Sequence, residues 1–584
     1  MRIRAMLIVA ATGLLAVGVF APGCTKPFEA ESQDAMRRQL IESHRAYLEA
    51  TAAGPVIELQ RVPSEVEAEL VKEGRIEQLD EVSGPGSYRD LKLDLAKDLV
   101  GNEESPVVRM TLKEVIHLAV RNNLDLQVAR MRPAIADTQL TQAQAAFDAV
   151  FFTNFDWNKL DTPNPAGTIP GLSGDQVDDS WTLNSGIRKP LTSGGVVFAQ
   201  TGLARTDEVP SVFAVNKFYR SDVTVGIEQP LLRNFGTDVN QSEINLARNA
   251  TASERAGLRD ALLQTALNAE TAYWDLVFTR QQLLVQLRLL ERTVADRERL
   301  VSRRDFDAAP VQITEASSFV ELRRSDVLRA RQNVRTASDN LKRLIQSPDL
   351  PVAGEELIMP ADVPVDAPLR YSLLDAVTTA LQQRPELKVA LLAIDDASIR
   401  QRVADNQRLP VLNLAFQARV NGTNEDIDDA YDQLTEANYI DYILGVEFEQ
   451  PIGNRAAEAA LRQRQLERRA AVIDYQRQAR DVVFEVKDAL RQLMTSYELI
   501  GATRAARRAA ADNLRALVAQ EDAGVELNPD FINLKLQSQE RLASAELQEA
   551  QALTDYNTAV ATFYRTTGTL LDQNNIQVSD TPTP

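Results

Sequence analysis

Two long segments of the chain place apolar residues at alternating steps of three and four. In the first segment these positions are Leu262, Ala266, Ala269, Tyr273, Leu276, Arg280, Leu283, Leu287, Leu290 and Val294, of which only Arg280 is polar. In the second segment they are Val483, Val486, Leu490, Leu493, Tyr497 and Ile500. Such spacing is typical of a coiled-coil seam. The helical period continues for about 70 residues in both segments, which predicts helices about 100 Å long.

Each long helix is followed by a short break and a returning helix. The breaks are residues 306–310 and 523–529, and both contain proline. The first returning helix carries apolar residues at seven-residue intervals, which favours packing against a partner helix. These residues are Val320, Val327, Val334 and Leu341. The pattern therefore predicts two long helical hairpins, at 236–347 and 453–570.

Ahead of each hairpin the apolar period changes from helical to alternating. Residues 147–232 and 411–451 are rich in aromatic and β-branched residues with Gly and Pro between them. Alternation of this kind predicts β-strands. We expect a strand pair in each region, and an extra hairpin near residues 181–204 of the first. A helix is also expected over 111–146, with a break near Pro133.

These elements recur because the chain contains two copies of one unit. The segment from Leu112 to Ala129 matches the segment from Leu373 to Ala390 at its leucines, its alanines and its acidic residue. Glu-Gln-Pro then follows in both copies, at 228–230 and at 449–451. Matching features in matching order indicate a duplicated unit. The first copy is longer, since 118 positions separate Leu112 from Pro230 and only 78 separate Leu373 from Pro451.

The strand pairs carry a physical requirement if they lie in a membrane. The smallest membrane barrels need about eight strands, so two pairs cannot close one. Open strand edges are not tolerated in lipid, and other copies of the chain would have to complete the barrel. A homo-oligomer follows in that case. The alternative is a soluble sheet packed on the helices.

The start of the chain resembles a secretory signal peptide, at residues 1–23. Arg2 and Arg4 precede an apolar run from Ala5 to Ala21. Cys24 follows and is the only cysteine, which excludes an intrachain disulfide or a cysteine-pair metal site. Its position resembles the bacterial lipobox, in which the thiol is acylated after cleavage, as in palmitate-bearing lipoproteins. The alternative is an ordinary signal followed by an incidental cysteine.

Charge narrows the class of partners. The formal net charge is −19, which argues against nucleic acid because its phosphates would be repelled. Residues 24–105 form a charged N-terminal arm in which one or two helices are expected. Catalysis is not indicated either: the two histidines, His44 and His117, are too far apart for a local zinc motif, and no nucleophile or phosphate-binding motif is present. We expect no enzyme activity, no cofactor and no metal site.

Taken together, the duplicated segments, the two Glu-Gln-Pro sequences, Ala272-Tyr273-Trp274 and the closing segment from Asp555 to Leu570 resemble the TolC-type outer-membrane efflux protein family, in its lipoprotein form. The resemblance covers about residues 110–570. It implies an α+β fold in which three copies form a twelve-stranded outer-membrane barrel above a helical tunnel. It also implies a periplasmic adaptor (a membrane fusion protein), an inner-membrane pump, and contact with outer-membrane lipid. The expected divisions are a first repeat at 106–350, a second at 351–570 and a tail at 571–584.

The ends of the hairpins are the candidate functional positions. The segment from Gly524 to Asn533 resembles a family segment in which a glycine turn precedes two acidic residues that line the closed periplasmic entrance. Asp530 matches the first acid, and Asn533 replaces the second. A first-turn acid is also favoured by the helix dipole, which is the alternative explanation of Asp530. The two tips are expected to contact the adaptor, unless they are ordinary helix connections. Their residues are Ala309, Pro310, Val311, Gly524, Val525 and Pro529.

Two functions from different classes remain at this point. The first is a trimeric outer-membrane channel that serves as the passive exit duct of a tripartite efflux or type I secretion system. The second is a non-conducting coiled-coil lipoprotein that bridges the outer membrane and the periplasm.

Overall fold

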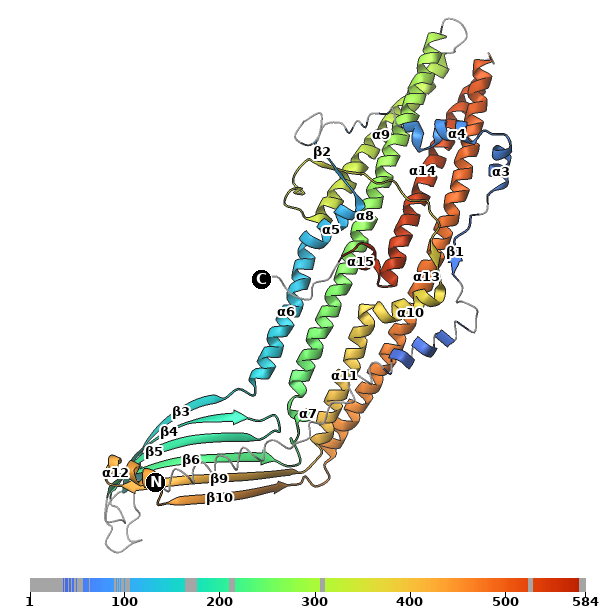
Figure 1. The fold of residues 1–584 in the computed structure, drawn as a ribbon. Helices are drawn as coiled ribbons and strands as arrows, with labels where there is room; N and C mark the ends of the chain where they lie inside the picture. Colours follow the sequence, from blue (N-terminus) through green and yellow to red (C-terminus); the bar gives the residue numbers. More distant parts are fainter. Residues whose placement is uncertain are drawn as a thin grey trace. The chain divides into compact units, whose positions relative to one another are not determined.

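The computed structural model describes residues 56–61, 63–88, 106–162, 176–209, 216–304, 310–523 and 529–576, with isolated residues between 35 and 49 and between 91 and 99. The chain separates into two compact units, residues 1–53 and 54–584. In the first unit the described residues are helical. The elements discussed below belong to the second unit (Figure 1).

Both copies of the duplicated unit begin with two short helices and end with a helical hairpin. In the first copy these are α5 (Leu112–Asn122), α6 (Leu124–Ala145), α8 (Ser242–Ser302) and α9 (Pro310–Ile345). In the second they are α10 (Leu373–Gln383), α11 (Pro385–Asn406), α13 (Arg455–Asp522) and α14 (Pro529–Thr566). The long helices α8 and α13 have 61 and 68 residues, which confirms the two extended helices expected from the seams.

The helix expected over 111–146 is interrupted at a different residue from the one predicted. Pro133 lies inside α6, and the chain turns at Asn123 instead. The Asn123 side chain accepts a hydrogen bond from the Leu126 backbone N–H and donates one to the Leu344 carbonyl. A cap that also binds α9 fixes the turn there. In the second copy Arg384 takes this place, with Pro385 as the first residue of α11.

The coiled-coil seams form the core of the helical region. Leu262, Ala266, Ala269, Tyr273, Leu276 and Leu283 are all buried. The heptad residues Val320, Val327, Val334 and Leu341 are buried too, and most of them pack in the same cluster as the α8 seam. The Tyr273 hydroxyl lies 2.9 Å from Asp362, whose carboxylate also accepts the Leu112 backbone N–H. This seam therefore joins the hairpin to the start of its own repeat.

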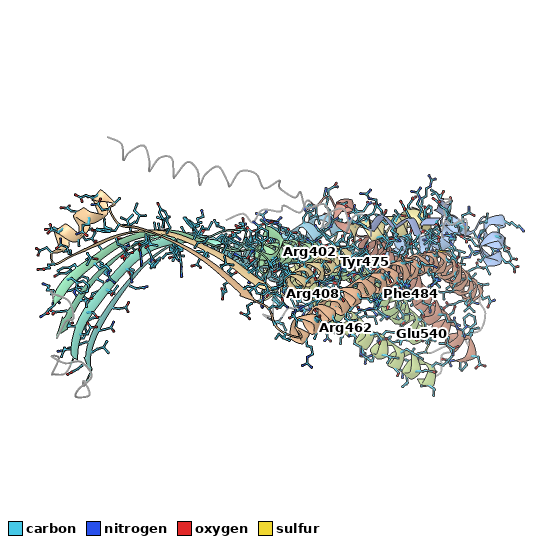
Figure 2. The ribbon with its side chains drawn as sticks, turned by 90° about the horizontal axis from the view of Figure 1, so that it is seen from below. Arg402, Arg408, Arg462, Tyr475, Phe484 and Glu540 are labelled. Atoms are coloured by element: carbon cyan, nitrogen blue, oxygen red, sulfur yellow. The ribbon has the colours of Figure 1, made fainter. Side chains whose placement is uncertain are left out.

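Six antiparallel strands form one sheet, in the order β10-β9-β6-β5-β4-β3. The strands are β3 (Val150–Thr162), β4 (Gln176–Pro190), β5 (Val196–Val209), β6 (Lys217–Pro230), β9 (Val411–Asn424) and β10 (Ile440–Glu449). The second copy contributes the expected pair, and the first contributes two pairs. The extra pair exists because residues 191–195 form a tight turn, in which the Leu191 N–H donates to the Gly195 carbonyl and Gly194 has a φ of +95°. Figure 2 shows the sheet as a curved surface beyond Arg402 and Arg408.

The remaining described elements are two short sheets and several short helices. β2 (Val107–Met110) pairs in parallel with β7 (Leu357–Pro360), and β1 (Ile57–Glu58) pairs antiparallel with β8 (Arg370–Tyr371). Four short helices, α3 (Glu65–Lys72), α4 (Ile76–Ser83), η1 (Pro85–Tyr88) and α7 (Thr237–Asn240), precede the long ones. α12 (Ile427–Glu436) lies between β9 and β10, and α15 (Leu570–Gln573) follows α14.

Candidate functional site

The sheet has one apolar face and one polar face. Odd-numbered residues of β3 to β6 and even-numbered residues of β9 and β10 share the apolar face, because the register pairs them across all six strands. One complete row across it is Phe151, Ile187, Ala199, Val225, Ala418 and Tyr442. The opposite, polar face carries Asn154, Asp156, Ser180, Thr182, Asn184, Gln200, Asp222, Thr224, Asn413, Gln417, Arg419 and Asp441. The alternation extends across all six strands, with exceptions such as Phe152 and Phe198 on the polar face.

Exposure on these faces is the reverse of that in a water-soluble protein. Val223 and Val225 on the apolar face are 41% and 50% exposed, whereas Thr224 between them is 3% exposed. On β10, Tyr442, Leu444, Val446 and Phe448 are at least 65% exposed. An apolar surface of this extent is not stable in water. It requires an apolar medium, and a wall with lipid-facing apolar residues is the arrangement of a membrane barrel.

The apolar face ends in an aromatic band and then in charges. The ring centroids of Phe155 and Trp181 are 6.2 Å apart, and those of Trp181 and Tyr219 are 6.4 Å apart. Trp157 donates its indole N–H to Asp179 across 2.8 Å. Aromatic side chains with one polar end concentrate where hydrocarbon meets water. The band therefore indicates one boundary of an apolar layer.

α12 packs on the apolar face close to this band. The Ser221 hydroxyl donates to the Ala430 carbonyl across 2.7 Å. Gly422 sits beneath the same carbonyl, and a Cβ there would lie only 2.0 Å from its oxygen. Ile427 and Tyr431 remain exposed on α12. The helix thus covers the far ends of β6 and β9.

The two outer strands of the sheet have one unpaired edge each. Among the described strands, β3 pairs only with β4, and β10 pairs only with β9. They have 13 and 10 residues, which makes both edges long. Exposed edges of this length are templates for another strand. They are satisfied if β3 of one copy pairs with β10 of the next.

At the other end of the molecule, the structure brings the two hairpin tips together. Leu300, Ala316 and Ile313 of the first hairpin pack with Ile532 of the second. Of the predicted contact residues, Pro310, Val311 and Pro529 are exposed, with Val311 at 75%. Ala309, Gly524 and Val525 lie outside the described residues, as does Cys24.

The predicted gate residues begin α14. Asp530 is exposed in its first turn, and Asn533 is partly buried. One turn further, Lys535 is buried and forms ion pairs with Asp296 of α8, at 2.7 Å, and with Glu521 of α13. Gln539 also donates to Asp296. This cluster was not predicted from the sequence, although Lys535 and Gln539 are at seam spacing between Ile532 and Leu542.

The sequence did not indicate a role for the charged N-terminal arm. In the structure, helices α3 and α4 of this arm form a clamp, that is, a set of buried ion pairs with α13. Arg507 and Arg508 of α13 are buried and both bind Asp80 of α4, at 2.8 Å. Arg508 also binds Glu67 of α3 at 2.7 Å. Burial alone would raise the pKa of Asp80, but hydrogen bonds from Arg508 and Arg507 outweigh it and hold that pKa below its usual value. The arm is therefore held to α13 by buried charge pairs.

A second part of the arm reaches α8 and α14. Tyr88 packs against Leu284, Val285 and Leu289 of α8. Beside it is a cavity of about 100 Å³, lined in part by Tyr88 and Glu546. Burial raises the pKa of Glu546 to about 7, although Tyr88 and Arg292 oppose that shift. The arm thus spans three long helices.

The described residues hold neither a metal-ligand cluster nor a membrane-spanning helix. No cluster of three or more potential metal ligands occurs among the described residues. In the same part of the chain, no helix combines the length and apolarity needed to cross a bilayer.

Part of the chain matches a known protein family. Residues 376–569, which hold most of the second repeat, match the model of the family described as outer membrane efflux protein. The match spans 194 of the 584 residues. Together with the fold, it supports an outer-membrane efflux channel of the kind that works in tripartite systems, which is a transport protein and not an enzyme. A search of curated protein sequences gave no significant match.

Solved structures show the same fold. The outer membrane channel CmeC of Campylobacter jejuni has a TM-score of 0.57 and 15% identity, covering 82% of this chain and 92% of its own. The outer membrane protein VceC of Vibrio cholerae has a TM-score of 0.57 and 15% identity, covering 78% and 96%. The outer membrane channel MtrE of Neisseria gonorrhoeae, in its open state, has a TM-score of 0.54 and 16% identity, covering 79% and 89%.

Proposed function

We propose that three copies of this chain assemble into a channel that is the passive exit duct of a tripartite efflux or type I secretion system. The observation that carries the proposal is the sheet, whose exposed side is apolar and whose two edges are unpaired. Such a sheet is complete only in lipid and only in a ring of copies. A non-conducting bridge needs the long hairpins but has no need of a curved wall with a polar inner face.

The ends of the hairpins supply the proposed contacts with the rest of the system. The exposed tip residues Pro310, Val311 and Pro529 would meet a periplasmic adaptor, which links the channel to an inner-membrane pump. Asp530 would line the closed entrance, one turn before the buried Lys535 cluster. An exposed apolar Val311 beside prolines suits a contact between proteins, because Val311 gains by leaving water.

The anchor is proposed at Cys24. Acylation there would hold the mature amino terminus at the outer membrane, and two or more acyl chains give stable anchoring where one is marginal. Intact-mass measurement of the purified protein tests this directly. A mature chain that starts elsewhere, or at an unmodified Cys24, contradicts it.

Native mass spectrometry of the detergent-extracted protein tests the assembly. The expected species is a trimer with no folded monomer, because a monomer leaves both strand edges open. Proteoliposomes that contain the protein and a trapped small dye should release the dye when the channel opens. A stable monomer contradicts the assembly, and intact trimers that never release dye support the bridging function.

A further inference from the structure

The sheet of one copy has six strands, and this number determines the width of the closed barrel. Resting on the proposed trimer, we infer that the barrel closes with eighteen strands instead of twelve, and that its outer end passes solutes too bulky for a twelve-stranded wall. The strands responsible are β4 and β5, the hairpin added in the first copy.

This extra hairpin is part of the wall. It lies between β3 and β6 and pairs with both of them over most of its length, with 13 residue pairs to β3 and 12 to β6. Its side chains also continue the division between the faces: Ile187 and Ala199 extend the apolar row, and Asn184 and Gln200 extend the polar face. A hairpin that folded away from the barrel would need neither the pairing nor the two-sided pattern.

The free edges can close the ring. β3 starts at the end of α6 and runs away from the helices, whereas β10 runs back toward the start of α13. A β3 strand and a neighbouring β10 strand are therefore antiparallel, like every other pair in the sheet. Three copies then give an even number of strands with no parallel pair, as a bacterial barrel requires.

Crowding among the side chains of the sheet itself indicates that the polar face is the inner one. Gly202 and Gly226 lie on this face, and neighbouring side chains occupy the space above them. A Cβ on Gly226 would be 2.5 Å from the Phe198 ring, and one on Gly202 would be 2.4 Å from an Asp222 oxygen. Side chains converge on the concave side of a curved sheet, so glycine is needed there.

The helices that adjoin the sheet are together about as wide as six strands. At this end α6 packs on α8, α8 on α11, and α11 on α13, which places four helices in a row. Helix axes spaced 8–10 Å apart span about 32–40 Å. Strands spaced about 4.8 Å and tilted about 40° span about 38 Å for six and about 25 Å for four. Six strands therefore cover the width of the four helices that carry them.

The resulting pore is wide and acidic. Eighteen strands at the same spacing and tilt give a backbone diameter of about 36 Å, against about 24 Å for twelve. Among the strand residues whose side chains the structure describes, the polar face carries seven acidic residues and three arginines. These are Asp156, Asp178, Asp222, Glu228, Asp441, Glu447 and Glu449 against Arg188, Arg220 and Arg419. Bulky solutes that are neutral or cationic fit this lumen.

Electron microscopy of the full-length oligomer in lipid nanodiscs tests the strand number. A cross-section through the barrel should show eighteen strands around a threefold axis. Twelve strands, with β4 and β5 outside the wall, would overturn this inference and leave the proposed channel intact. An assembly without a closed ring of three copies would overturn the proposed function as well.

A deletion of residues 176–209 tests the width independently. It removes β4 and β5 while β3 and β6 stay antiparallel and joined at their outer ends, so a twelve-stranded ring can form. Gln417→Cys on the polar face of β9 is introduced into both chains and treated with maleimide polymers of increasing size. Two controls are Phe416→Cys, which faces lipid and should not react, and the parent without an added cysteine. The largest polymer that reacts should be about 1.5-fold wider in the full-length protein. Equal limits in the two chains would contradict the wider barrel.

Discussion

Lys535 on α14 and Asp296 on α8 form a 2.7 Å ion pair that joins the two hairpins of one chain near their tips. Both side chains are largely buried, at 8% and 12% exposure, and Glu521 on α13 completes the group. Removing one partner of a buried pair leaves an unpaired charge, which costs about 3–5 kcal/mol. The tips therefore cannot separate without breaking a strong contact.

Lys535→Met should weaken the closed tip. We expect a lower thermal unfolding midpoint and a larger open fraction in bilayer recordings, because Asp296 and Glu521 lose their shared cation. Arg477→Met is the matched control, since Arg477 and Asp474 on α13 form an exposed pair that contributes little. Equal open fractions in the two variants would mean that the Lys535 cluster does not hold the tip closed.

Asp530 should make the closed entrance sensitive to cations. If three copies of its carboxylate line the entrance, they concentrate a negative potential there, and Mg²⁺ or hexaamminecobalt(III) should block the current. Asp530→Asn should weaken the block without loss of the trimer, and Asn533→Asp should strengthen it. Asp474→Asn, on the surface of α13, is the control and should change nothing. An unaltered block in Asp530→Asn would mean that the residue is only a first-turn acid favoured by the helix dipole.

Two variants, each with an arginine at one of two adjacent residues, distinguish the two faces of the sheet. Phe416 lies on the apolar face of β9 and Gln417 on its polar face. Phe416→Arg should cost about 2–4 kcal/mol in lipid and reduce the yield of folded trimer, because the charge faces hydrocarbon. Gln417→Arg should assemble normally. The yield of heat-resistant trimer on a gel measures both, and a reversed order would exchange the inner and outer faces.

Glu546 predicts a pH dependence of stability. Its pKa is raised to about 7 from 4.5, so the folded state holds a proton that the unfolded state releases. This contribution is fully present below pH 4.5 and is lost as the pH rises through 7, with a total on the order of 3 kcal/mol. The thermal midpoint of the wild type should fall over this range, whereas that of Glu546→Gln should fall less. Parallel curves for the two proteins would contradict the assignment.

The helical part of the fold was predictable because its pattern is long and regular. Spacing alone predicts the first returning helix, through apolar residues at seven-residue intervals. These residues are buried as expected: Val320, Val327, Val334 and Leu341. The family resemblance, which rests on the order of several motifs, is confirmed by the family match over 376–569. Both signals extend over many residues, so single exceptions such as Arg280 do not obscure them.

Other features depend on contacts between residues far apart in the chain. Asn123 ends α5 because its side chain also reaches the Leu344 carbonyl, and no local signal separates it from Pro133 as the break. The clamp of Asp80 on Arg507 and Arg508 joins residues more than 400 positions apart. From the sequence alone these arginines would be assigned to an ordinary solvated helix face, because only the fold brings Asp80 next to them.

The gate and the adaptor contacts stay predictions. The structure places Pro310, Val311, Pro529 and Asp530 at exposed tips, which is where such roles require them. Their function depends on the neighbouring copies and partners that complete the entrance. The number of strands that each copy contributes, in contrast, is a property of one chain. The sequence indicated the extra hairpin near 181–204, and the sheet shows that this hairpin is part of the wall.

Copies of this chain are expected to close a conducting pore across a lipid bilayer. Single-channel recording of the purified, full-length oligomer in a planar bilayer tests it most directly. A conducting pore should give discrete current steps that favour cations, with longer openings in Lys535→Met. A bilayer that contains intact trimers of both the wild type and Lys535→Met, and that passes no current in either case, would contradict the claim.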